Sequence, residues 1–141
     1  MSRPKSAAVV LAAGKGTRMR SARPKVLHSV ASRPMILHIL DRLKELAVDR
    51  TVVVVGADQT EVAGAVAPAL TAVQSPPRGT GDAVLAARTH LEGFDGDILI
   101  LCGDTPLLTA DTLSRLLDRR RAKDDPAVVL LGGAMTFGGL E

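Results

Sequence analysis

The chain of 141 residues has the length of one domain, and 46% of its residues are hydrophobic, which is enough for a buried core. Its single cysteine excludes an internal disulfide and any zinc site built from cysteines. The net charge of +3 comes from one segment, because residues 14–28 carry five basic and no acidic side chains. That segment contains no aromatic side chain on which bases could stack, and the whole chain has only two Phe and no Trp or Tyr. The sequence shows neither a leader peptide nor an apolar run of membrane-spanning length, so we expect a cytoplasmic protein that binds neither nucleic acid nor a membrane.

Apolar runs and helical patterns alternate along the chain. Residues 7–13 form a continuous apolar run, which is typical of a strand buried on both faces of a parallel sheet. Residues 34–47 repeat apolar side chains at helical spacing. In chain order we expect a strand at 7–13, a helix at 34–47, a strand at 51–55, a helix at 58–66 with Asp58 as its cap, a strand at 70–74, a loop at 75–79, a helix at 81–91, a strand at 97–101, a helix at 109–121 and a fifth strand at 127–131.

This alternation predicts an α/β fold with a mostly parallel sheet covered by helices on both faces, a Rossmann-like three-layer sandwich. We treat residues 1–141 as a single domain, and as a partial one, because the glycine-rich residues 132–141 have no helical period. Ligands of such folds bind beyond the carboxyl ends of the strands. The loop that starts at Gly14 and the carboxylate of Asp104 both follow predicted strands.

The loop after the first strand has the composition of a phosphate-binding loop. A P-loop is excluded because Gly14-Lys15 is followed by Gly16, and a dinucleotide fingerprint is excluded because Met19 stands where the third glycine belongs. Glycines still allow backbone N–H groups to approach phosphate oxygens closely. Arg18 can grip a phosphate with two hydrogen bonds, and Lys25 can supply a point charge. The alternative is a glycine-rich turn with solvated basic side chains.

The residues from Leu11 to Met19, continued by Pro24–His28 and by Arg33-Pro34-Met35, resemble the signature of the nucleotidyltransferases that make nucleoside-diphosphate sugars. They are most similar to bacterial N-acetylglucosamine-1-phosphate uridyltransferases, and the resemblance covers roughly residues 6–131. It implies a Mg²⁺-dependent transfer of a uridylyl group from UTP to N-acetylglucosamine 1-phosphate, which releases pyrophosphate and serves cell-wall synthesis. That activity usually shares a chain with an acetyltransferase β-helix domain, to which nothing here can be matched.

The resemblance also implies roles for single residues. Arg18 and Lys25 would hold the phosphates as catalytic residues, and Asp104 would ligate Mg²⁺. The nucleotide would further be bound by Leu11, Ala12, Ala13, Gly14, Lys25, Gln74, Gly79, Thr80 and Gly103. The amide of Gln74 carries a donor and an acceptor, which can complement the imide edge of uracil. A carboxylate at a strand end suits Mg²⁺, although an Asp before Pro106 could also serve as a turn or cap residue.

The chain departs from this family at a few positions. Pro77 and Arg78 stand where the family commonly has a Gln and a small or apolar residue. Cys102 replaces a usual aromatic residue and is expected to be a buried small apolar side chain. The three histidines are expected to be packed or solvated.

Three other functions stay open. The chain could be a nucleotidyltransferase for another sugar or for a molybdopterin, or a UTP-binding unit without turnover. A nucleic-acid binder is the remaining class, and it would show steeply salt-dependent affinity.

Overall fold

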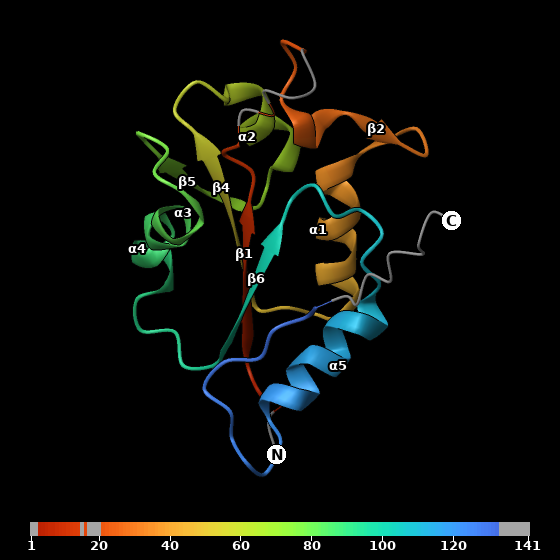
Figure 1. Cartoon of the computed structure of the whole chain (residues 1–141), viewed down its shortest axis with the longest axis vertical. Helices are drawn as coiled ribbons and strands as arrows, with labels where there is room; N and C mark the ends of the chain where they lie inside the picture. Colours follow the sequence, from red (N-terminus) through yellow and green to blue (C-terminus); the bar gives the residue numbers. More distant parts are fainter. Residues whose placement is uncertain (1–2, 15, 17–20, 133–141) are drawn as a thin grey trace, which may run out of the picture.

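The computed structural model describes residues 3–14, 16 and 21–132. Its centre is a parallel sheet with the strand order β5-β4-β1-β6 (Figure 1). The strands are β1 (Ser6–Leu11), β4 (Arg50–Gly56), β5 (Leu70–Gln74) and β6 (Asp97–Cys102). From β1 the chain adds β4 and β5 on one side and then returns to place β6 on the other. This reversal beside β1 is the switch point at which open α/β sheets bind ligands.

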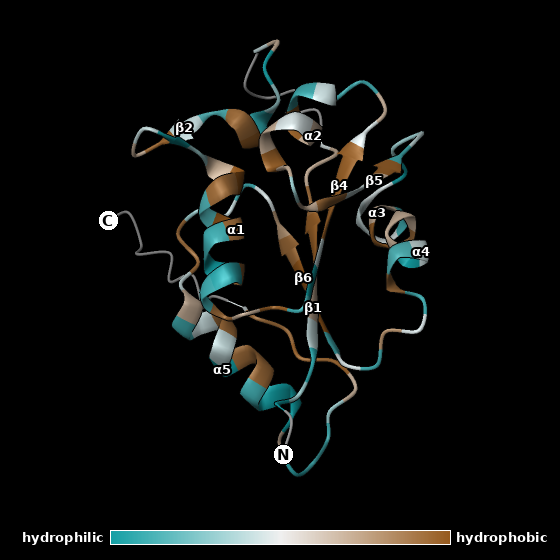
Figure 2. Ribbon diagram, turned by 180° about the vertical axis from the view of Figure 1, so that it is seen from behind, coloured by the Kyte–Doolittle hydropathy of each residue, from teal (hydrophilic) through white to brown (hydrophobic). Residues whose placement is uncertain are grey.

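Helices cover both faces of the sheet, as Figures 1 and 2 show from opposite sides. One face carries the helices α1 (Met35–Glu45), α2 (Thr60–Val66) and α5 (Ala110–Arg120), and the other carries α3 (Thr80–Ala86) and α4 (Arg88–Leu91). The α/β three-layer arrangement with a parallel sheet is therefore confirmed. Among the described helices, none combines the length and apolar character needed to cross a bilayer.

The alternation of side chains along the strands produces two separate cores. In β1, Ala8 and Val10 point into the larger core under α1, α2 and α5, whereas Val9 points to the opposite face. All three are fully buried, which explains why this strand reads as a continuous apolar run. The second core is made largely of small side chains, with Ala83 of α3 packed against the sheet.

A short segment between β1 and α1 was not predicted as regular structure. It contains the 3-10 helix η2 (Lys25–Leu27) and a two-stranded antiparallel hairpin of β2 (Ser29–Val30) and β3 (Arg33–Pro34). Val26 and Leu27 are buried in the larger core, so η2 is anchored against the sheet. This anchoring places Lys25, the first residue of η2, near the carboxyl ends of the strands.

The structure corrects several predicted elements. The helix expected at 81–91 is divided into α3 and α4, and α2 begins at Thr60 with Gln59, not Asp58, at its cap position. The fifth strand expected at 127–131 was wrong: these residues belong to no strand, and Leu130 is 87% exposed. A strand exists only where a partner accepts its backbone hydrogen bonds, and a β-branched apolar composition does not supply that partner.

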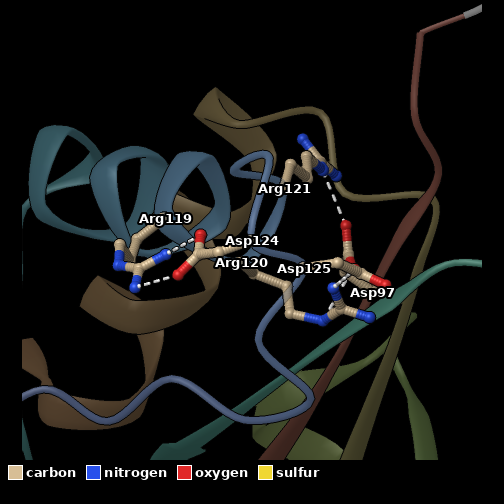
Figure 3. Close-up of polar contacts among 6 residues, drawn as sticks. All are labelled: Asp97, Arg119, Arg120, Arg121, Asp124 and Asp125. Carbon is tan, nitrogen blue, oxygen red and sulfur yellow. Dashed lines mark hydrogen bonds and ion pairs between the residues drawn. The ribbon is translucent and has the colours of Figure 1, made fainter.

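Ion pairs join the end of α5 to the amino-terminal end of the sheet (Figure 3). Asp97, the first residue of β6, accepts a hydrogen bond of 2.6 Å from Nε of Arg121 and lies 3.6 Å from Nε of Arg120. Arg119 donates two hydrogen bonds of 2.8 Å to Asp124, and these lower the pKa of the Asp124 carboxyl. The cluster fixes α5 at the end of the sheet opposite to the ligand-binding end.

Candidate active site

A pocket of about 510 Å³ lies beyond the carboxyl ends of β1, β5 and β6. That volume falls in the range of pockets that hold small ligands. Its walls are Leu11, Ala12, Ala13, Gly14, Gly16, Lys25, Val26, Gln74, Pro77, Gly79, Thr80, Ala83, Cys102 and Asp104. The pocket thus occurs at the switch point of the sheet, which the strand order by itself would indicate.

The glycine loop forms one wall and is fixed by hydrogen bonds at its base. The N–H group of Ala12 donates to the carbonyl oxygen of Val54 at 2.8 Å. Gln59, which is 7% exposed, accepts from the N–H group of Gly56 at 2.7 Å and donates to the carbonyl oxygen of Gly14 at 3.5 Å. The N–H groups of Ala13 and Gly14 have no acceptor among the described residues.

Gly16 makes room for the lysine of the site. Its φ of +56° lies in the left-handed region, and a Cβ atom there would stand 2.8 Å from Cβ of Lys25. Any larger residue would be strained and would push the lysine away. The second glycine of the loop is therefore required by the position of Lys25.

Lys25 and Asp104 form an ion pair at the opening of the pocket. Nζ of Lys25 donates to Oδ2 of Asp104 at 2.7 Å, which joins η2 to the loop after β6 across 79 positions of sequence. The two side chains are 41% and 35% exposed, so solvent screens the pair. The arrangement places one cation and one carboxylate where a phosphate and a metal ion could each take a partner.

At the other side of the pocket, Gln74 is held by two hydrogen bonds. The residue is 6% exposed, and its Nε2 donates to the carbonyl oxygen of Gly79 at 3.0 Å and to Oδ2 of Asp82 at 2.9 Å. Gly79 has a φ of +106°, which glycine adopts without strain, and it precedes the first residue of α3. Its carbonyl oxygen also accepts from the N–H group of Ala83.

The structure brings most of the sequence-predicted residues together. Nine of them line the pocket: Leu11, Ala12, Ala13, Gly14, Lys25, Gln74, Gly79, Thr80 and Asp104. Gly103 is buried behind the pocket wall, where its N–H group donates to the carbonyl oxygen of Leu11 at 2.9 Å. Arg18 lies outside the described residues. The roles of all these residues remain predictions.

Two residues that contact the site, Gln59 and Asp82, were not predicted, and the expectation for Cys102 was wrong. Cys102 is exposed and lines the pocket, because it occupies the face of β6 that no helix covers. Gln59 contacts Gly14, 45 positions away in sequence, and Asp82 contacts Gln74, which lies outside its helix. No helical or strand periodicity in the sequence predicts either contact. The local signal for Asp82 is its position three residues after Gly79, which places it in the first turn of α3 and near the end of β5, where Gln74 lies.

A sheet with this strand order, a glycine loop after β1 and a carboxylate after β6 defines an α/β nucleotide-binding domain. Residues 8–134 match the family of MobA-like NTP transferase domains, and the chain belongs to this family. The resemblance seen in the glycine loop to nucleotidyltransferases is thereby confirmed.

Curated relatives and solved structures agree with this assignment. The bifunctional protein GlmU of Paramagnetospirillum magneticum is 54% identical over 94% of this chain, and that of Rhodospirillum rubrum is 55% identical over 91%. The chain spans 29% of the length of each of these relatives. A nucleotidyl transferase from Methanothermobacter thermautotroptrophicus superposes with a TM-score of 0.67 at 26% identity, covering 81% of this chain and 57% of that one. Rv0371c from Mycobacterium tuberculosis has the same fold, with a TM-score of 0.70 at 24% identity over 84% of this chain and 61% of that one.

Proposed function

We propose that the pocket binds UTP with a divalent cation, Mg²⁺, and that the chain supplies the nucleotide site for uridylyl transfer to N-acetylglucosamine 1-phosphate. The observation that carries this proposal is that one pocket has a hydrogen-bonding amide, Gln74, at one side and the Lys25–Asp104 pair at the other. The resemblance to GlmU relatives at 54–55% identity supports the choice of UTP over other nucleotides.

The nucleoside would lie between the glycine loop and the start of α3. Gln74, Gly79 and Thr80 stand together on that side, and the apolar side chains of Ala83 and Pro77 complete the wall. A base that hydrogen-bonds to a buried amide is selected because a base with the wrong pattern leaves the amide unpaired.

The triphosphate would extend along the glycine loop toward Lys25. The N–H groups of Ala13 and Gly14, which have no acceptor among the described residues, and the ammonium of Lys25 would supply positive potential along this path. Arg18, predicted to grip a phosphate, belongs to the same loop in sequence.

A single carboxylate, Asp104, is available to a metal ion in the described part of the pocket. Its oxygens fit Mg²⁺, which is commonly bound through one or two carboxylates, with phosphate oxygens and water completing the octahedron. When bound there, Mg²⁺ would neutralise phosphate charge.

In the proposed reaction, a phosphate oxygen of the sugar phosphate attacks the α-phosphorus of UTP, and pyrophosphate leaves from the opposite side. That oxygen is already ionised near neutral pH, so the chain needs no general base. Lys25 would hold the phosphates in line and balance the charge that develops on the leaving group.

Calorimetric titration of the purified chain tests the binding half of the proposal. We expect UTP to bind more tightly than ATP or GTP, and Mg²⁺ to tighten the binding. Asp104→Asn should abolish the tightening by Mg²⁺, because the neutral amide is a weak metal ligand. Equal affinity for all nucleotides would exclude the uridylyl assignment, and an Asp104→Asn variant with full Mg²⁺ dependence would exclude Asp104 as the ligand.

A pyrophosphate-release assay with UTP, Mg²⁺ and N-acetylglucosamine 1-phosphate tests the transfer itself. Product formation supports the uridylyltransferase. Tight UTP binding without product supports a nucleotide-binding unit instead, and product with a different sugar phosphate changes only the acceptor.

A further inference from the structure

We infer that Asp82 is a specificity-determining residue: it fixes the amide of Gln74 so that the carbonyl oxygen, and not the NH₂ group, is presented to the base. The inference rests on the proposed function and names how the pocket would distinguish uracil from cytosine. Asp82 does not line the pocket, so it would be a positioning residue that acts through Gln74.

The orientation of a glutamine amide is often ambiguous, because its oxygen and nitrogen have the same shape. Here the partners remove the ambiguity. The carbonyl oxygen of Gly79 and the carboxylate of Asp82 can only accept hydrogen bonds, and both lie within 3.0 Å of the same atom of Gln74. That atom must be the NH₂ nitrogen, and its two hydrogens are both used.

The remaining atom, Oε1, has no hydrogen-bond donor among the described residues, although Gln74 is 6% exposed and lines the pocket. It therefore presents an acceptor to whatever base enters. Uracil offers an N–H donor at N3, which such an acceptor can bind. Cytosine offers an unprotonated N3 acceptor at the same place, and the two acceptors would repel each other.

A cytosine could be accommodated only if the Gln74 amide turned over and presented its NH₂ group. Turning it would place Oε1 against both the Gly79 carbonyl and the Asp82 carboxylate, and two hydrogen bonds would become two repulsive contacts. Of these two hydrogen bonds, only the one to the Asp82 carboxylate is charge-assisted. Removing this carboxylate should therefore lower the free-energy cost of the turned amide more than removing the bond to Gly79 would.

The experiment measures the ratio of the dissociation constants of CTP and UTP, in the presence of Mg²⁺, for the whole chain and its variants. Both nucleotides carry the same triphosphate, so the ratio is insensitive to the change in charge and to general damage to phosphate binding. We expect Asp82→Asn and Asp82→Ala to lower this ratio about tenfold, the effect of one wrongly paired buried group. The Asn variant keeps the size of the side chain and carries the test if the Ala variant does not fold.

Two further variants separate positioning from other roles. Asp111 is matched to Asp82, because it too is an acidic residue in the first turn of its helix, α5, and Asp111→Asn should leave the ratio unchanged. In a Gln74→Ala background, Asp82→Asn should have no further effect on the ratio.

An unchanged ratio in the Asp82 variants, with UTP still preferred, would overturn the inference while leaving the proposed function intact. A further fall in the Gln74→Ala background would also overturn it, since Asp82 would then act without Gln74. A parent chain that binds UTP no better than CTP would refute the base selectivity in the proposed function and this inference together.

Discussion

Lys25 joins the proposed phosphate-binding side of the pocket to Asp104, the proposed metal ligand. Its ammonium donates to Oδ2 of Asp104 at 2.7 Å. In the proposed complex each charge would exchange this partner for another: the lysine would take a phosphate, and the carboxylate would take the cation. The charge-assisted hydrogen bond holds the two side chains near each other in the structure.

The first prediction concerns Lys25→Ala. We expect it to weaken UTP binding at least tenfold and uridine binding hardly at all, because the ammonium should contact phosphate and not the nucleoside. Calorimetric titration with both ligands measures the difference. Arg23→Ala is the matched control, since Arg23 is also basic but faces Glu61 at 3.7 Å and does not line the pocket. Equal losses for UTP and uridine would mean that Lys25 supports the loop instead.

At the scale of elements, α5 is held to the sheet by its last turn. Asp97, whose side chain is 16% exposed, faces Arg120 and Arg121 together, whereas Asp124 faces Arg119 at the surface (Figure 3). Removing the Asp97 carboxylate would take one acceptor away from both arginines, and Arg120 would keep only Asp125 and Arg121 only the carbonyl oxygens of Pro4 and Lys5. Removing an exposed partner such as Asp124 should cost less, because solvent replaces it.

We therefore expect Asp97→Ala to lower the free energy of unfolding by about 1–3 kcal/mol, and Asp124→Ala to lower it by less. Urea denaturation of the two variants and the parent chain measures the difference. Equal effects of the two substitutions would show that the contact at the start of β6 adds nothing beyond a surface ion pair.

A second element-scale contact ties β1 to the segment before β4. Asp49 accepts from the N–H group of Ser6 at 2.9 Å and from Arg3 at 2.8 Å. The Ser6 hydrogen bond, aided by the charge of Arg3, lowers the pKa of the Asp49 carboxyl below its ordinary value. A lowered pKa means that this contribution to stability is complete above the ordinary aspartate value and is lost as the pH falls through the folded value.

We expect Asp49→Asn to be less stable than the parent chain at pH 7, and the difference in melting temperature between the two to shrink below about pH 4. Thermal unfolding followed from pH 3 to pH 7 checks this. Melting curves that stay a constant distance apart over this range would contradict the assignment.

At the scale of the molecule, the sheet is covered unevenly. The helices α3 and α4 lie over β1, β4 and β5, so the side chains of Ile98 and Ile100 on the same face of β6 remain 46% and 52% exposed. In the described structure β6 pairs only with β1, and an apolar strand at a sheet edge favours association with another chain.

The last prediction is that the 141-residue chain self-associates through β6 and that Ile100→Lys shifts it toward the monomer. Sedimentation velocity over a series of protein concentrations measures the shift. Leu85→Lys is the control, because Leu85 is 65% exposed on α3 and away from the edge, so the same added charge should change little there. Equal shifts in both variants would point to net charge as the cause.

The sequence by itself determined the four strands of the parallel sheet, the helical segments between them, the glycine loop and the family. These features depend on local patterns: a buried strand reads as an apolar run because both of its faces are covered, as at Val9, and a loop that receives phosphate needs glycine in its backbone. The resemblance then supplied candidate residues, nine of which line one pocket.

Only the tertiary structure decided which distant groups meet. Residues 127–131 form no strand although their composition predicts one, and the exposure of Cys102 depends on which part of the sheet the helices cover. The contacts of Lys25 with Asp104 and of Gln74 with Asp82 join residues 79 and 8 positions apart, at distances set by the packing of the whole sheet. Local sequence patterns favour a helix or a strand, but the partner of a side chain depends on where the other elements pack.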